Sequence, residues 1–148
     1  MVERDDARRS ILRQGFIILL LGLLSGFGIV GGGPHARSWM ATHLTLMLTA
    51  VLIVLVGLVW DELRLSARQR AVLRFAVVFD GYWGALAGVF ATVFSIPGPV
   101  SGHGAQPSGW QASVFFALLL PVLTLLPFLF TGLTLYGLRG KSEPQSPG

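Results

Sequence analysis

The sequence predicts an all-α integral membrane protein built as a bundle of four transmembrane helices, and three observations support this. Hydrophobic residues make up 53% of the 148 residues, and only 12% are charged, whereas a soluble domain carries about 25% charged residues. The charged residues lie between long uncharged stretches. Four of these stretches reach the roughly 20 residues that a helix needs to cross a bilayer core.

The predicted spans cover most of the chain, which we interpret as one membrane domain over residues 1–148. The first span is not interpreted as a cleavable signal peptide, because no A-x-A-like site follows its apolar run. Residues 139–148 are too polar and proline-rich to pack, so we expect a disordered tail. The approximate limits of the spans are residues 15–33, 39–60, 71–96 and 112–138.

The basic residues predict the orientation of the bundle. They gather before the first span, between the second and third spans, and in the C-terminal tail. An even number of spans places these three regions on one face, and the predicted connections on the other face contain only Arg37. The positive-inside rule then puts both termini in the cytoplasm of a multi-pass cell-membrane protein. No basic stripe with interleaved aromatic residues is present, so nucleic acid is not an expected partner.

Small residues and prolines inside the spans predict how the helices pack. Two prolines of the last span, Pro121 and Pro127, each lack a backbone donor and predict a bend there. Glycines four residues apart allow helix backbones to approach closely in lipid. They occur in the first and third spans, as Gly22 with Gly26 and Gly84 with Gly88.

Asp80 is an acidic residue near the centre of the third predicted span. It follows Ala71 by nine residues, so a rise of 1.5 Å per residue places it roughly 14 Å deep. A carboxylate at that depth costs about 2.5–3.5 kcal/mol, so Asp80 must face the bundle interior. Tyr82 and Trp83 are candidate hydrogen-bond donors to it. Asp80 is therefore either a site residue or a neutral acid that bonds a neighbouring helix.

His43 is the histidine that a buried cofactor could use. It lies about one turn inside the second span, whereas His35 and His103 fall in predicted loops. The alternative is an interfacial or hydrogen-bonded histidine with no ligand. If haem is bound, one subunit supplies one axial histidine, and an open ferric position can act as a Lewis acid. The sequence contains no cysteine and no H-E-x-x-H, G-x-S-x-G or Walker motif, so the chemistries of those groups are excluded.

Several short motifs resemble the small four-helix membrane isomerases that include styrene oxide isomerase and hydroxylaminobenzene mutase. The motifs are ATHL at 41–44, GLVWDELRLS at 57–66, FDGYWG at 79–84 and GLRG at 137–140. The resemblance implies a homotrimer that holds haem b near subunit boundaries, with His43 as the axial ligand and metal-binding residue. It also implies that Asp80 matches the family's helix-three acid. Ferric iron would act as a Lewis acid on an epoxide or an arylhydroxylamine, which is rearranged without net redox change.

The chain differs from the family pattern at several polar positions. Thr49 and Ala50 stand where the pattern has Asn-Gly, and Gly84 and Gly88 stand where it has Asn and Tyr. The glutamate associated with the mutase falls at residue 45 or 46, which are threonine and leucine. Thr49 either offers its hydroxyl to a substrate or bonds a carbonyl of its own helix.

Three functional hypotheses follow. The first is an isomerase with haem b on His43 that acts on small hydrophobic substrates from the lipid bilayer, with Asp80, Tyr82 and Thr49 as candidate site residues. The second is a haem-binding sensor or ligand-binding protein that catalyses no reaction. The third is a cofactor-free structural or transport subunit in which Asp80 and His43 only bind neighbouring helices.

Overall fold

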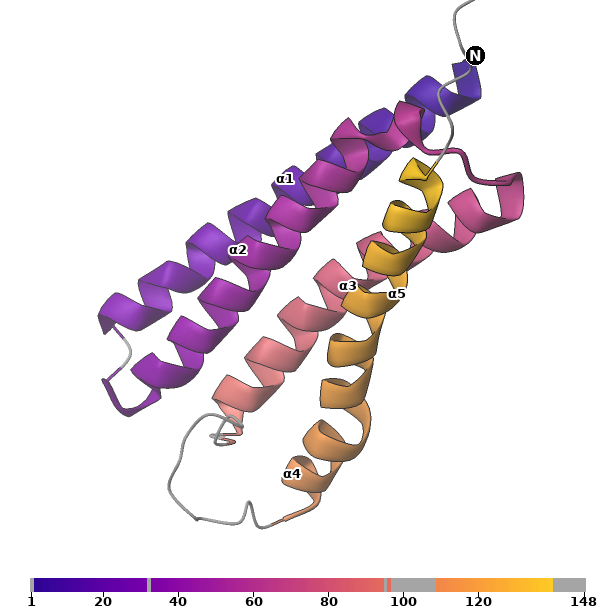
Figure 1. Cartoon of the computed structure of the whole chain (residues 1–148). Helices are drawn as coiled ribbons and strands as arrows, with labels where there is room; N and C mark the ends of the chain where they lie inside the picture. The colour runs from indigo at the N-terminus through magenta and orange to yellow at the C-terminus, as the bar shows by residue number, and fades with distance from the viewer. Residues whose placement is uncertain (1, 32, 95, 97–108, 140–148) are drawn as a thin grey trace, which may run out of the picture.

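The computed structural model describes residues 2–31, 33–94, 96 and 109–139, and this part of the chain is helical apart from short connections (Figure 1). The predicted all-α fold is thereby confirmed. Three segments at the end, α4, η3 and α5, follow one another directly and form one long helix. The elements are α1 (Val2–Gly31), the 3-10 helix η1 (Gly33–His35), α2 (Ala36–Leu58), the 3-10 helix η2 (Trp60–Glu62), α3 (Ala67–Val93), α4 (Trp110–Val114), the π-helical turn η3 (Phe115–Leu119) and α5 (Leu120–Leu138).

Four helices are long and apolar enough to cross a membrane, as the sequence predicted. Helices of this length and composition are typical of a multi-pass membrane protein. Each helix begins before its expected limit, because residues that precede the apolar runs are also helical, whereas the first three helices end two or three residues earlier than expected. The predicted tail at 139–148 lies outside the described residues except for Arg139, and so does the loop that contains His103. The four candidate spans are Asp5–Gly31, Ala36–Leu58, Ala67–Val93 and Trp110–Leu138.

The start of α3 shows why one of these limits moved. The side chain of Ser66 accepts a hydrogen bond from the backbone N–H of Gln69, and the Gln69 side chain accepts one from the backbone N–H of Ser66. This capping box satisfies two donors that a helix start otherwise leaves unpaired. The helix therefore begins at Ala67, before the apolar run.

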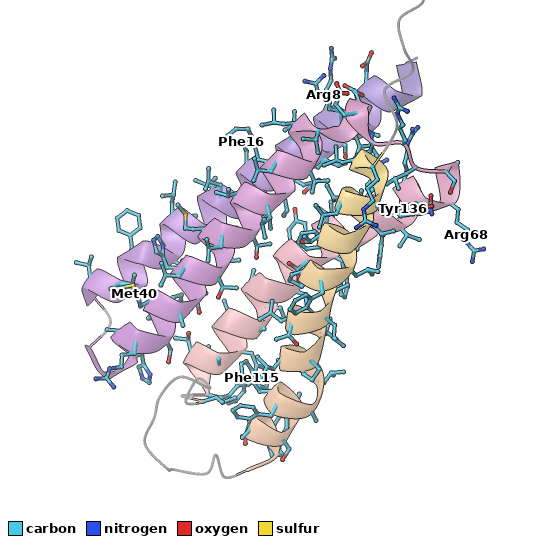
Figure 2. The ribbon with its side chains drawn as sticks, in the orientation of Figure 1. Arg8, Phe16, Met40, Arg68, Phe115 and Tyr136 are labelled. Carbon is cyan, nitrogen blue, oxygen red and sulfur yellow. The ribbon has the colours of Figure 1, made fainter. Side chains whose placement is uncertain are left out.

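The three basic regions of the chain meet at one end of the bundle, where Figure 2 labels Arg8 and Arg68. Arg8 forms an ion pair with Asp61 at 3.0 Å, which joins α1 to η2. The backbone N–H of Arg64 donates to the carbonyl oxygen of Gly137 at 3.0 Å and joins the α2–α3 connection to the end of α5. We call this end of the bundle the termini end.

A continuous apolar core fills the termini end and the middle of the bundle. α1 and α2 run side by side along their lengths (Figure 1), and a Cβ added at Gly57 would lie 2.8 Å from the Leu12 side chain. Outward-facing side chains such as Phe27, 75% exposed, and Phe128, 79% exposed, leave an apolar surface suited to lipid. All four long helices contribute fully buried apolar side chains, namely Ile11, Ile18, Ile53, Leu73, Val77 and Phe130.

The fourth span contains a π-helical turn directly before its first proline. The backbone N–H of Leu120 donates to the carbonyl oxygen of Phe115, five residues earlier, and Pro121 has no N–H to continue an α-helical pattern. The Nε1–H of Trp83 on α3 donates to the carbonyl oxygen of Leu119 at 3.1 Å. The indole thus fastens the π-helical turn to α3, and the long helix curves in this region (Figure 1).

Candidate functional site

His43 lies on α2 and faces the backbone of α1. Its Nδ1 atom is 2.7 Å from the carbonyl oxygen of Gly22, which also accepts a bond from the Ser25 hydroxyl at 2.6 Å. A Cβ added at Gly26 would lie 3.4 Å from the same Nδ1 atom. The sequence indicated the two glycines only as packing residues, but Gly26 leaves room for the half-buried imidazole and Gly22 supplies the acceptor.

This contact determines which ring nitrogen of His43 is available. A carbonyl oxygen can only accept, so Nδ1 carries the hydrogen in this bond. In the neutral imidazole Nε2 then keeps its lone pair, which is the form that binds a metal. Metal-binding histidines commonly donate their other N–H to a backbone carbonyl in this way. The local chemistry of His43 therefore fits an axial ligand.

The described residues contain no cluster of metal-binding side chains. No group of three or more His, Cys, Asp or Glu side chains comes together among the described residues. A metal ion held by protein side chains alone has no such cluster there. A haem iron is different, because the porphyrin supplies four nitrogens and one histidine can complete the attachment.

Asp80 lies inside the bundle, as expected, and is 0% exposed. Neither of its carboxyl oxygens has a hydrogen-bond partner in the described part of the chain. The two donors that the sequence indicated are used elsewhere: the Tyr82 hydroxyl donates to Oε1 of Gln14 at 2.6 Å, and the Trp83 indole donates to the Leu119 carbonyl. Asp80 is thus a buried polar group available to a ligand.

Thr49 lies on the neighbouring helix at the same depth of the bundle as Asp80. A Cβ added at Gly84 on α3 would lie 3.9 Å from Cγ2 of Thr45 on α2. Thr49 follows Thr45 by one turn, Asp80 precedes Gly84 by one turn, and the two helices are antiparallel, so both residues lie one turn nearer the termini end. Thr49 is 7% exposed, and its hydroxyl has no hydrogen bond to another described residue.

His43 and Asp80 lie at different depths of the bundle. The side chain of Thr42, next to His43, packs against Gly88, and Asp80 is two turns along α3 from that glycine. The rise of an α-helix makes this offset about 12 Å. The structure therefore places the histidine nearer the end opposite the termini and groups Thr49 with Asp80 deeper in the bundle.

Two of the differences from the resembled pattern have a steric explanation. A Cβ at Gly88 would lie 2.5 Å from Cγ2 and 2.7 Å from Oγ1 of Thr42, so a tyrosine there requires α2 to move. A Cβ at Gly84 would lie 3.3 Å from Cδ1 of Leu123, so an asparagine requires a small shift of that leucine. Thr42 therefore occupies the space beside α3 in which a larger side chain at position 88 would begin.

Comparison with known proteins assigns the chain to a family. The model of the styrene oxide isomerase family matches residues 7–139. Hydroxylaminobenzene mutase HabB of Ectopseudomonas oleovorans is 29% identical over 135 residues, which cover 88% of this chain and 80% of that protein. No solved structure matches significantly. With its four apolar helices and a family match that extends from α1 to the end of α5, this chain belongs to the styrene oxide isomerase family, a family of isomerases and mutases.

Proposed function

We propose that this chain is a haem-b-dependent membrane isomerase of small hydrophobic epoxides or arylhydroxylamines. The observation that carries the proposal is the bond from Nδ1–H of His43 to the Gly22 carbonyl, because it leaves Nε2 with a lone pair for iron. A ferric haem supplies a Lewis acid that draws electrons from a substrate oxygen or nitrogen atom. The remaining contributions come from side chains of the chain itself.

Asp80 and Thr49 provide the polar lining of the proposed pocket. Asp80 is fully buried with two unpartnered oxygens, and Thr49 lies at the same depth on α2 with a hydroxyl that bonds no described residue. In a low-dielectric interior such groups bind the polar part of an otherwise apolar ligand strongly. We assign to them the orientation of a substrate whose apolar part lies against the surrounding helices. Tyr82 contributes to the bundle through Gln14.

The proposed setting is the cell membrane, with both termini in the cytoplasm and three copies in the assembly. The gathering of basic residues at the termini end supports this orientation by the positive-inside rule. Large apolar side chains on the outer surface of the bundle support contact with lipid and with further copies. A site shared between subunits also suits a bundle whose single histidine ligand is only half-buried.

The absorption spectrum of the purified protein tests the haem proposal. Wild-type protein should show a Soret band, and His43→Ala should lose it. His35→Ala is the matched control, since it removes another histidine from the same end of the bundle and should retain the band. A colourless wild type from cells with abundant haem, or a band unchanged in His43→Ala, would overturn the proposal.

Turnover tests the isomerase part separately. Styrene oxide and phenylhydroxylamine are each incubated with haem-loaded protein, and isomeric products of unchanged mass are measured. Haem-loaded protein that isomerises neither compound nor any related epoxide or arylhydroxylamine would favour the sensor hypothesis.

A further inference from the structure

A line of paired small and polar residues runs along the interface between α2 and α3. At the end opposite the termini, Thr42 packs against Gly88. One turn deeper, Thr45 lies near Gly84, and one further turn along each antiparallel helix brings Thr49 and Asp80 to the same depth. Each level thus pairs a threonine of α2 with a glycine or the aspartate of α3. We call this line of six residues the threonine seam.

The deeper polar groups of the seam lack internal partners. The hydroxyl of Thr42 donates to the carbonyl oxygen of Ser38 at 2.9 Å, as threonines in membrane helices commonly do. The hydroxyls of Thr45 and Thr49 form no such bond within the described residues. Both oxygens of Asp80 are likewise unpartnered. An unpaired buried polar group costs about 1–3 kcal/mol, so the two unpartnered oxygens of Asp80 indicate a missing polar ligand.

The packing on the two sides of Asp80 is unequal. Toward the termini end the neighbouring side chains are apolar and fully enclosed, with Ile53, Val77 and Leu73 all 0% exposed. Toward the opposite end Thr45 and Gly88 are only half-buried, although the Thr42 side chain fills the space next to Gly88. A polar ligand can therefore approach Asp80 past the half-buried Thr45, whereas the apolar core closes the other direction.

We propose that the threonine seam is a water site that connects Asp80 with the face of the membrane opposite the termini, and with that face alone. Water can satisfy both hydroxyls and the carboxyl group, since each bound water makes two to four hydrogen bonds. The seam would hold a short file of water molecules. This inference goes beyond the proposed isomerase function and does not depend on haem.

Because the chain contains no cysteine, single cysteines can report water along the seam. Thr45→Cys and Thr49→Cys place a thiol in the seam, and Ile53→Cys and Val56→Cys place one in the core toward the termini end. Silver ions dissolve in water and bind thiolates, which form only where water reaches the sulfur. Arg37→Cys and Arg68→Cys place exposed thiols at the two ends of the bundle. In sealed vesicles, the reaction of each with silver shows which face of the membrane is being tested.

Silver should protect Thr45→Cys and Thr49→Cys from later maleimide labelling. The rate of protection should be about tenfold or more higher when silver is applied from the Arg37 side than from the Arg68 side. The core cysteines should stay unprotected from both sides. Equal reaction of Ile53→Cys and Thr49→Cys, faster reaction from the Arg68 side, or an inert Thr49→Cys would overturn the proposal.

A second measurement needs no cysteine. The infrared carboxyl band that disappears in Asp80→Asn should shift when folded wild-type protein is moved into D2O, because seam water exchanges the proton. A band that stays unshifted for hours in the folded protein would also overturn the proposal. Loss of the Soret band in the separate haem experiment would leave both of these outcomes unchanged, so the two proposals fail independently.

Discussion

The Nδ1 atom of His43 and the carbonyl oxygen of Gly22 lie 2.7 Å apart and join α2 to α1. This bond gives the glycine pair of α1 a role beyond helix packing. Gly22 supplies the acceptor, and the missing side chain of Gly26 leaves space beside the ring. The orientation of the imidazole therefore depends on α1, although the histidine belongs to α2.

Enlarging Gly26 should weaken haem binding while leaving the histidine in place. In Gly26→Val the Cβ would lie 3.4 Å from Nδ1 of His43, and the added methyl groups would turn the ring away from the Gly22 carbonyl. Loss of such a supporting bond commonly costs about 10–100-fold in affinity. Titration of apoprotein with haem measures the change. Gly132→Val is the control, because a Cβ there meets nothing within 4 Å, and unchanged affinity in Gly26→Val would contradict the proposed orientation.

Removing the Asp80 carboxyl group should stabilise the bundle and impair the enzyme. In Asp80→Leu an apolar branched side chain of similar shape replaces a carboxyl whose oxygens have no protein partner. We expect the free energy of unfolding to rise by about 1 kcal/mol, within the cost of an unpaired buried polar group, while turnover falls. Thermal unfolding and product formation measure the two effects. A lower unfolding temperature with full activity would show that Asp80 has a structural partner instead.

Hydropathy alone was enough to locate the four helices, because the bilayer imposes length and composition on each span. It placed the start of α1 too late, since the arginine-rich segment before the apolar run forms helix as well. The burial of Asp80 was also predictable from the cost of a charge in lipid. Both predictions, the four spans and the burial of Asp80, follow from how apolar and charged residues interact with the lipid bilayer.

Contacts between particular side chains of different helices were harder to predict from the sequence. The four-residue spacing of glycines predicted close packing but not that Gly22 would accept a bond from His43. Tyr82 and Trp83 flank Asp80 closely in sequence, yet a helix turns about 100° per residue, so they point toward α1 and the π-helical turn. Partners of this kind depend on the rotation of each helix about its axis, which hydropathy does not determine.

The hydrogen bond between Tyr82 and Gln14 should contribute to stability through both partners. The Tyr82 hydroxyl donates to Oε1 of Gln14 at 2.6 Å and links α3 to α1. Tyr82→Phe should lower the free energy of unfolding by about 0.6 kcal/mol, the average for such bonds between membrane helices. Gln14→Leu should cost a similar amount, and the double variant should cost less than the sum. Additive losses would show that the two side chains do not act as a pair.

The contact between Gly88 and Thr42 should make position 88 intolerant of even one added carbon. A Cβ in Gly88→Ala would lie 2.5 Å from Cγ2 of Thr42, whose side chain packs directly against α3. Overpacking of this kind costs about 1–3 kcal/mol, measurable by thermal unfolding. Thr42→Ala should recover part of that loss in the double variant, since it removes the two nearest atoms. Gly132→Ala, which has open space, should be neutral. A Gly88→Ala variant as stable as the wild type would show that Thr42 and Gly88 are not in close contact.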